Sequence, residues 1–177
     1  EYLNAKETVE PAIPKIFGTL PDDRAADRLA LARWLVSDDN PLVGRVVVNR
    51  AWRSFFGAGI VRTAGDFGTQ SEPPSHRELL DHLADDFGTK GWSIKRLHRQ
   101  IVLSATYQQA VGKPPASDPN NRLLSVFPHR RLGAEQVRDT MLSAAGLMTH
   151  QVGGPSVFPP QPSGVNEMAY GSPKWDT

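Results

Sequence analysis

The densest group of ionisable residues in this sequence surrounds the predicted helix that begins near Ala134. His129 precedes this helix, and Glu135 and Asp139 lie four positions apart within it, so both carboxylates share one helix face. Such a pair, assisted by a histidine, could act as a general acid and a general base. The same spacing is typical of exposed ion-pair ladders, and we assign no catalytic residue on this pattern alone. The residues that could take part in catalysis are Asp66, His129, Glu135 and Asp139.

A stripe of polar and aromatic residues on one predicted helix could bind a ligand. Arg45, Asn49 and Trp52 follow one another at i, i+4 and i+7, and Phe56 continues the stripe. An indole offers a platform for a sugar or peptide, and arginine and asparagine donate hydrogen bonds. The alternative is a packing stripe against a neighbouring domain or the Pro-rich N-terminal arm. With Trp92 as a second platform, the predicted binding residues are Arg45, Asn49, Trp52 and Trp92.

Arg50 has apolar helical neighbours, Val46 and Val47, and this pattern predicts that it points partly inward. A buried guanidinium needs a carboxylate or carbonyl partner, because an unpaired buried charge is strongly destabilising. Carboxylates that could pair with it are those of Asp66, Glu135 and Asp139. We therefore predict structural ion pairs, with a substrate-anchoring arginine as the alternative; the residues involved are Arg50, Asp66, Arg138 and Asp139.

The sequence contains no pattern for a cofactor or metal. The absence of cysteine excludes disulfides, thiolate metal ligands and a cysteine nucleophile from these residues. No histidine pair has the spacing of a zinc-binding helix, and no Gly-Lys-Ser/Thr sequence follows the glycines at Gly153-Gly154. We therefore predict no cofactor within this segment. The five histidines are His76, His82, His98, His129 and His150.

The elements that must position these residues are predicted to be helices. Apolar residues recur at helical spacing over 24–37, where Asp22 and Asp23 would complement the N-terminal dipole. Asn40-Pro41 predicts the start of a second helix that runs to Phe56 and stops at Gly57. An S-x-x-E capping box, Ser75–Glu78, predicts a third helix that ends at Gly88.

Two further helices are predicted downstream of these. Ser93 would precede a helix from Ile94 to about Gln109. The last helix would run over 134–145, with Val137, Met141 and Ala144 inward and Gly146 as its stop. The fold class is therefore all-α, a compact array of about five helices with long Gly/Pro-rich loops.

Composition and charge set the broad class and domain organisation. The 177 residues are 39% hydrophobic, which is enough apolar surface for a core, and no run approaches the ~18 apolar residues of a membrane span. The net charge of +1 argues against nucleic acid, even though Lys95, Arg96, Arg99 and Gln100 would lie on the second helix of a helix-turn-helix. We predict an arm or linker over 1–21, a helical domain over 22–150 and a Pro/Gly-rich segment over 151–177, all part of a larger protein.

An ordered series of short motifs resembles a known family along nearly the whole chain. The series begins with Asn40-Pro41-Leu42, Val48-Asn49-Arg50-x-Trp52 and Phe56-Gly57-x-Gly59-Ile60-Val61-x-Thr63, and continues through Asp66-Phe67-Gly68, Pro74-Ser75-His76, Gly91-Trp92-Ser93, Arg130-Arg131-Leu132 and Pro160-Gln161-Pro162. This pattern resembles the planctomycete-specific PSD domain, a domain of unknown function. Arg77 and His82 depart mildly from the family pattern, which often has Pro and Trp there.

The resemblance implies a setting and supplies no reaction. Members of the family occur in large exported proteins, many of which carry a cytochrome-c-like module, so the parent protein is expected to be exported or periplasmic and to be able to carry haem in a separate domain. We expect a structural or binding module whose partners are neighbouring domains of the same protein. The alternatives are a polysaccharide-active or hydrolytic enzyme domain, and a carbohydrate-binding module without catalysis.

Overall fold

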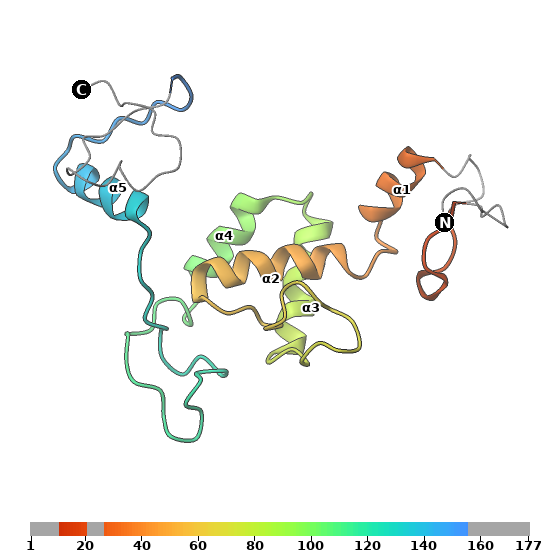
Figure 1. The fold of residues 1–177 in the computed structure, drawn as a ribbon, viewed down its shortest axis with the longest axis horizontal. Coiled ribbons are helices and arrows are strands. Elements are labelled where there is room, and N and C mark those ends of the chain that lie inside the picture. Colours follow the sequence, from red (N-terminus) through yellow and green to blue (C-terminus); the bar gives the residue numbers. More distant parts are fainter. Residues whose placement is uncertain (1–10, 21–26, 156–177) are drawn as a thin grey trace, which may run out of the picture. The chain divides into compact units, whose positions relative to one another are not determined.

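The computed structural model describes residues 11–20 and 27–155, and within these ranges the chain is built from helices and loops (Figure 1). In this part of the chain there is no strand, and one isolated bridge pairs Val111 with Phe127. The predicted all-α fold class is confirmed. No helix of the described part is long and apolar enough to cross a membrane. The helical elements are the short 3-10 helix η2 (Lys15–Phe17) and the α-helices α1 (Arg28–Leu35), α2 (Val43–Phe56), α3 (Arg77–Thr89), α4 (Ile94–Val102) and α5 (Ala134–Ala144).

The chain divides into two compact units, Glu1–Arg131 and Leu132–Thr177. The first unit contains η2 and α1 to α4, and the second contains α5. The division falls inside the stretch 22–150, which the sequence predicted as one helical domain.

The core of the first unit lies between α2, α3 and α4, each of which contacts the other two (Figure 1). Its apolar side chains recur at helical spacing on each helix, as expected for amphipathic helices that bury one face. The loop after α2 adds two further apolar residues to this core. The buried members are Val48, Trp52, Phe56, Ile60, Val61, Leu80, Leu83, Phe87, Leu97 and Ile101.

Aromatic rings extend the core at the C-terminal end of α2. Phe56 stacks on Trp52 with ring centroids 4.3 Å apart, and the rings of Tyr107 and Phe127 meet edge to face at 5.3 Å. Tyr107 and Phe127 also contact Phe56, so the long loop after α4 is fixed to the helices by its aromatic side chains.

The ends of α1 and α2 follow local chemistry, although α1, at Arg28–Leu35, is shorter than the predicted stretch 24–37. The Asp27 carboxylate accepts the backbone N–H of Ala30 at 2.8 Å and caps α1; Asp22 and Asp23, which the sequence suggested for this end, lie outside the described residues. The Asn40 side chain accepts the N–H groups of Leu42 and Val43 at the start of α2. Gly57, with a φ of +82°, ends α2 as predicted.

The ends of α3 differ from the prediction. Ser75 does not cap the helix, because its backbone N–H donates to the carbonyl of Ile60 at 2.9 Å and its hydroxyl also points to that carbonyl. The helix continues through Gly88 to Thr89, and the residue with a left-handed φ of +79° is Gly91. The spacing of a capping box is present, but the Ser75 side chain bonds the distant carbonyl of Ile60 and not the first turn of the helix.

The fourth helix is shorter than predicted and ends at Val102 instead of Gln109. Ser104 explains the difference, because its hydroxyl donates to the carbonyl of Ile101 at 2.6 Å and accepts the N–H of Tyr107 at 3.2 Å. A serine that bonds the local backbone in this way competes with helical hydrogen bonding. The chain turns there and brings Tyr107 onto the core.

In the second unit, α5 has nearly the predicted bounds, and Gly146 follows it with a φ of +69°. The prediction that Val137, Met141 and Ala144 face inward is wrong for the described structure, where all three residues are exposed. The helical period was correct, but it defines only a common face and not what covers that face.

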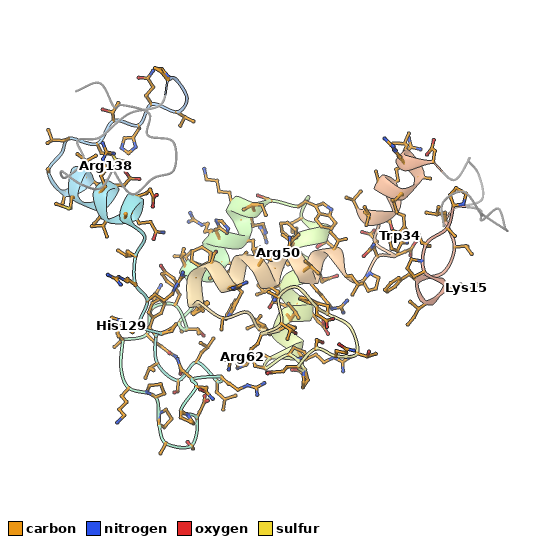
Figure 2. All side chains as sticks on the ribbon, in the orientation of Figure 1. Lys15, Trp34, Arg50, Arg62, His129 and Arg138 are labelled. Atoms are coloured by element: carbon orange, nitrogen blue, oxygen red, sulfur yellow. The ribbon has the colours of Figure 1, made fainter. Side chains whose placement is uncertain are left out.

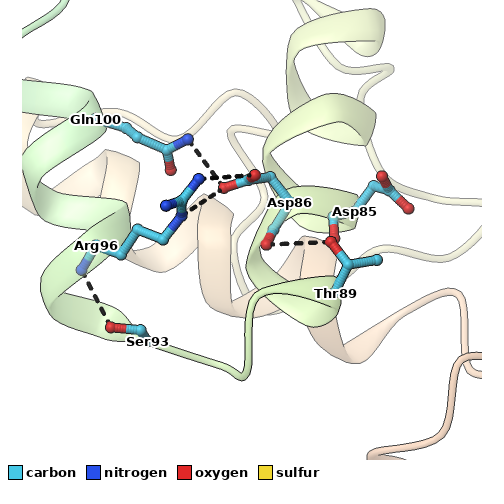
Figure 3. A network of polar contacts seen from close by, with 6 residues as sticks. All are labelled: Asp85, Asp86, Thr89, Ser93, Arg96 and Gln100. Atoms are coloured by element: carbon cyan, nitrogen blue, oxygen red, sulfur yellow. Dashed lines mark hydrogen bonds and ion pairs between the residues drawn. The ribbon is translucent and has the colours of Figure 1, made fainter.

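A charged cluster joins α3 to α4 and fixes their relative position (Figure 3). Arg96 donates two hydrogen bonds to the carboxylate of Asp86 at 3.1 and 3.2 Å, and Gln100 donates a third at 2.9 Å. The hydrogen bonds from Arg96 hold the pKa of Asp86 below its ordinary value, although burial acts in the opposite direction.

Replacing Asp86 with asparagine is expected to destabilise the protein at pH 7 and to have a smaller effect below about pH 3.8. The pKa of Asp86 is depressed in the folded state, so its contribution is present above the unfolded pKa and is lost as pH falls through the folded pKa. Urea midpoints of both proteins at pH 7 and pH 3 measure this. Asp85→Asn is the matched control, since the Asp85 carboxylate has no cationic partner within the described residues. If Asp86→Asn lowers the urea midpoint by the same amount at pH 7 and at pH 3, the prediction is wrong.

Candidate functional site

A groove of about 380 Å³ lies in the first unit beside the start of α2 and the second half of α3. The segment before α2 and its first turn contribute Asn40, Gly44 and Arg45, whereas α3 contributes Asp81 and Asp85. Trp92, in the turn between α3 and α4, completes this set. Two of the four residues predicted to bind a ligand, Arg45 and Trp92, therefore line one groove.

A close approach of two helices forms one part of this groove. A Cβ atom at Gly44 of α2 would lie 3.2 Å from the carbonyl oxygen of Ala84 on α3, so the two backbones are nearly in contact there. Only a glycine allows this separation without a shift of the neighbour. The approach brings the polar groups at the start of α2 next to the carboxylates of α3.

Arg45 and Asp81 form the main ion pair of the groove. The Arg45 Nε donates to Asp81 Oδ1 at 2.6 Å, and its Nη1 donates to the carbonyl of Pro41. The second Asp81 oxygen lies 3.8 Å from the Nε of Arg77. Both side chains of the pair remain about one third exposed, so they are held in place and still reach the groove.

The backbone places Trp92 at the groove in a strained conformation. Its φ is +58°, a left-handed value that is rare for a bulky residue and costs on the order of 1–3 kcal/mol. The backbone N–H of Trp92 donates to the backbone carbonyl of Phe87 at 2.9 Å, and the indole ring meets the Phe87 ring edge to face, with ring centroids 5.2 Å apart. The half-buried indole thus packs on the core and also lines the groove.

Asn49 and Trp52, the other two predicted binding residues, face the core. Asn49 is fully buried, and its side chain holds the backbone of Val61: Nδ2 donates to the carbonyl at 2.9 Å and Oδ1 accepts the N–H at 2.9 Å. Trp52 is only 4% exposed and stacks on Phe56. The prediction that these two present a binding face must be corrected, because the stripe they define is the packing face of α2.

The predicted environment of Arg50 is also wrong. Arg50 is exposed on α2 (Figure 2), and it forms no ion pair with a carboxylate of the described residues. Its neighbours Val46 and Val47, one turn earlier on the helix, are themselves only half-buried, so they do not draw Arg50 into the core. Asp66 is exposed as well, and its carboxylate accepts the N–H of Gly68 at 2.7 Å within a turn. Arg50 and Asp66 therefore form no ion pair with each other.

The remaining candidates are distributed over both units. His129, which is labelled in Figure 2, is an exposed residue of the first unit, and it does not line the groove. In the second unit, Glu135 and Asp139 are exposed, and the Asp139 carboxylate lies 3.8 Å from the Nη1 of Arg138. An exposed pair of sequence neighbours contributes little stability. A catalytic role for Asp66, His129, Glu135 and Asp139 stays a prediction.

Among the described residues, no group of three or more carboxylate and histidine side chains is arranged to hold a metal ion. Two residues that line the groove were not predicted from the sequence: Asp81 and Asp85, four positions apart on α3. Their i, i+4 spacing was visible, but the partner of Asp81 is 36 residues away along the chain. A local pattern contains no signal for that pairing.

Comparison with known proteins identifies the family and gives no further relative. No curated protein and no solved structure matches the chain. The model of the family PSD1, described as a protein of unknown function (DUF1553), matches residues 27–176. This match includes all the helices α1 to α5 and the whole groove. Because it covers all but the ends of the sequence, the chain belongs to the PSD1 family.

Proposed function

We propose that this chain is a non-catalytic binding module and that its groove takes a hydroxyl-rich ligand, a carbohydrate. The observation that carries the proposal is that Arg45, Asp81 and Trp92, from three different elements, line one groove. An aromatic face beside fixed hydrogen-bonding groups is the combination expected of a small polar binding site. None of the four catalytic candidates lines this groove.

The ion pair in the groove suits a hydroxyl group. A guanidinium has five N–H donors. In Arg45, Nε donates to the carboxylate of Asp81 and Nη1 donates to the backbone carbonyl of Pro41. Its other donors and the exposed part of the Asp81 carboxylate offer a fixed donor beside a fixed acceptor. A sugar hydroxyl both donates and accepts a hydrogen bond, so neighbouring hydroxyls could engage both groups. Because the protein already orders this pair, binding requires little further ordering.

Loss of either the indole or the guanidinium is expected to lower affinity for the sugar at least tenfold. A glycan array with the chain identifies the ligand, and calorimetry then compares Trp92→Ala and Arg45→Gln with the original protein. A tenfold loss corresponds to about 1.4 kcal/mol, which is close to the lower end of what one hydrogen bond to a charged group contributes. Trp92→Phe keeps an aromatic face and should retain most of the affinity.

Two substitutions serve as matched controls for these variants. Arg50→Gln removes an exposed arginine from the same helix, and Trp34→Ala removes a half-buried indole; neither residue lines the groove. Both control variants should bind the sugar with an affinity within twofold of that of the original protein. Circular dichroism verifies that each variant is folded. An array without any bound glycan, or an affinity that neither groove substitution changes, would refute the proposal.

A second candidate is docking against neighbouring domains of a larger, exported protein. Exposed apolar residues in the second unit support it, since contiguous exposed apolar surface is often an interface. Hydrogen exchange of α5 in the longer protein and in this chain alone tests the docking, and secretion of the tagged parent protein from its host tests the export. Equal exchange of α5 in both contexts would rule out docking there. The exposed residues are Leu132, Val137, Met141, Leu147 and Val152.

A further inference from the structure

A segment without secondary structure, residues 128–133, links the two units along the chain. The boundary between the units falls inside it, after Arg131. From His129 onward every residue of the segment is exposed, and Leu132 is 55% exposed. Exposed chain that joins compact units is a preferred place for proteolytic cleavage. The arginines of this segment therefore raise the question of a protease that cuts after basic residues.

The two arginines of the segment are held differently. Arg130 donates through Nη1 to the backbone carbonyl of Ser54 in α2, and the aliphatic part of its side chain lies against Gly57. Among the described residues, nothing forms a hydrogen bond with the backbone of Arg131 or Leu132. A protease binds its substrate as an extended strand through backbone hydrogen bonds. Arg131 can enter such a site directly, whereas Arg130 must first leave α2.

Arg62 and Arg122, two basic residues in other loops, have backbones that are already bonded. The carbonyl of Arg62 accepts the N–H of Ala64 at 3.0 Å. The carboxylate of Asp118 accepts the N–H groups of Arg122 and Leu123, both at 2.8 Å. Cleavage after either arginine requires these hydrogen bonds to open first, and such local opening slows proteolysis.

The remaining basic residues of the described part are less suitable still. The N–H of Lys90 donates to the carbonyl of Asp86 at 3.1 Å, at the end of α3. Lys113 precedes Pro114, whose ring replaces the N–H that a protease would bind. All the others lie within helices, which must unfold locally before they are cut. Arg131 is thus the basic residue of the described chain that best meets the needs of a protease.

We propose that the peptide bond between Arg131 and Leu132 is a processing site for a trypsin-like serine protease. Hydrolysis adds water across this bond and leaves a carboxylate on Arg131 and an ammonium group on Leu132. The cut separates residues 1–131, which include the core of α2 to α4, from the unit that contains α5. All residues of the sugar-binding groove lie between positions 37 and 92, so the cut leaves the groove intact.

Limited digestion of the full chain with trypsin tests the proposal, with the fragments identified by intact mass. The fragment that ends at Arg131 should form at least tenfold faster than any cut within α2 to α4. Arg131→Gln should abolish this fragment, and no equally fast cut after Arg130 should replace it. Arg130→Gln is the matched control and should leave the rate at Arg131 within twofold. Both arginines are exposed, and circular dichroism verifies that the variants are folded.

Urea below the unfolding midpoint separates cleavage of the folded protein from cleavage after opening. The cuts within α2 to α4 should accelerate, because they depend on the open population. The rate at Arg131 should change no more than that of a short peptide with the sequence of residues 128–133, which reports the effect of urea on trypsin itself. Earlier cleavage within α2 to α4 or after Arg122, equal rates after Arg130 and Arg131, or equal acceleration at Arg131 and in the helices overturns the proposal.

Discussion

Replacement of Asn49 by alanine is expected to lower the free energy of unfolding by about 3 kcal/mol. The asparagine side chain is fully buried and forms two hydrogen bonds of 2.9 Å with the backbone of Val61. Alanine would leave the N–H and carbonyl of Val61 without partners inside the core, and each unpaired buried group is costly. The loop after α2 would also lose its fixed position on that helix.

Urea denaturation at pH 7 measures this loss, and Asn40→Ala is the matched control. Asn40 also accepts two backbone N–H groups, those of Leu42 and Val43, but at a partly exposed helix start. Removal of such a cap costs about 1 kcal/mol. Equal losses of unfolding free energy in both variants would show that the buried hydrogen bonds between Asn49 and Val61 stabilise the protein no more than an exposed helix cap does.

Asn49→Asp separates the donated from the accepted hydrogen bond. An ionised carboxylate can accept the Val61 N–H but cannot donate to the Val61 carbonyl, so at pH 7 the variant should also be destabilised. Burial raises the pKa of the introduced carboxyl above its unfolded value. The protonated group can donate again, and stability should therefore be regained as pH falls and lost as pH rises through that raised pKa. A loss that does not change with pH would contradict this account.

Local chemistry was sufficient to predict the class of the fold and several helix ends. Asn40 before Pro41 and Gly57 after Phe56 act within one turn of the helix they bound, so the sequence around them contains the whole signal. Ser75 shows the limit of this reasoning. Its spacing to Glu78 fits a capping box, but the serine bonds the carbonyl of Ile60, 15 residues earlier. A contact of that range overrides a local preference.

The candidate site was predictable only residue by residue. Arg45 and Trp92 were chosen for their chemistry, and both line the groove. Asn49 and Trp52 were placed on the same stripe correctly, but helical spacing does not say whether a stripe faces solvent or the core. The buried Asn49 fits the core because Val61, twelve residues later, meets both its donor and its acceptor. No pattern within α2 contains that information.

Gly59→Ala is expected to destabilise the protein by about 2 kcal/mol through steric conflict in a packed core. A Cβ atom at Gly59 would lie 2.5 Å from the carbonyl oxygen of Val61 and 2.7 Å from both side-chain polar atoms of Asn49. Part of this obstruction is backbone, so it cannot move away as the end of a flexible side chain would. Urea denaturation gives the loss, with Gly65→Ala of the same loop as the control.

The control glycine differs from Gly59 only in its surroundings. Nothing lies within 4 Å of a Cβ atom at Gly65, so Gly65→Ala should change the free energy of unfolding by less than about 0.5 kcal/mol. In the double variant Asn49→Ala/Gly59→Ala, the asparagine side chain no longer obstructs the new Cβ atom. The loss of unfolding free energy in the double variant should therefore be smaller than the sum of the losses in the two single variants. Full additivity of the two losses would mean that Gly59 is not packed against Asn49 and Val61.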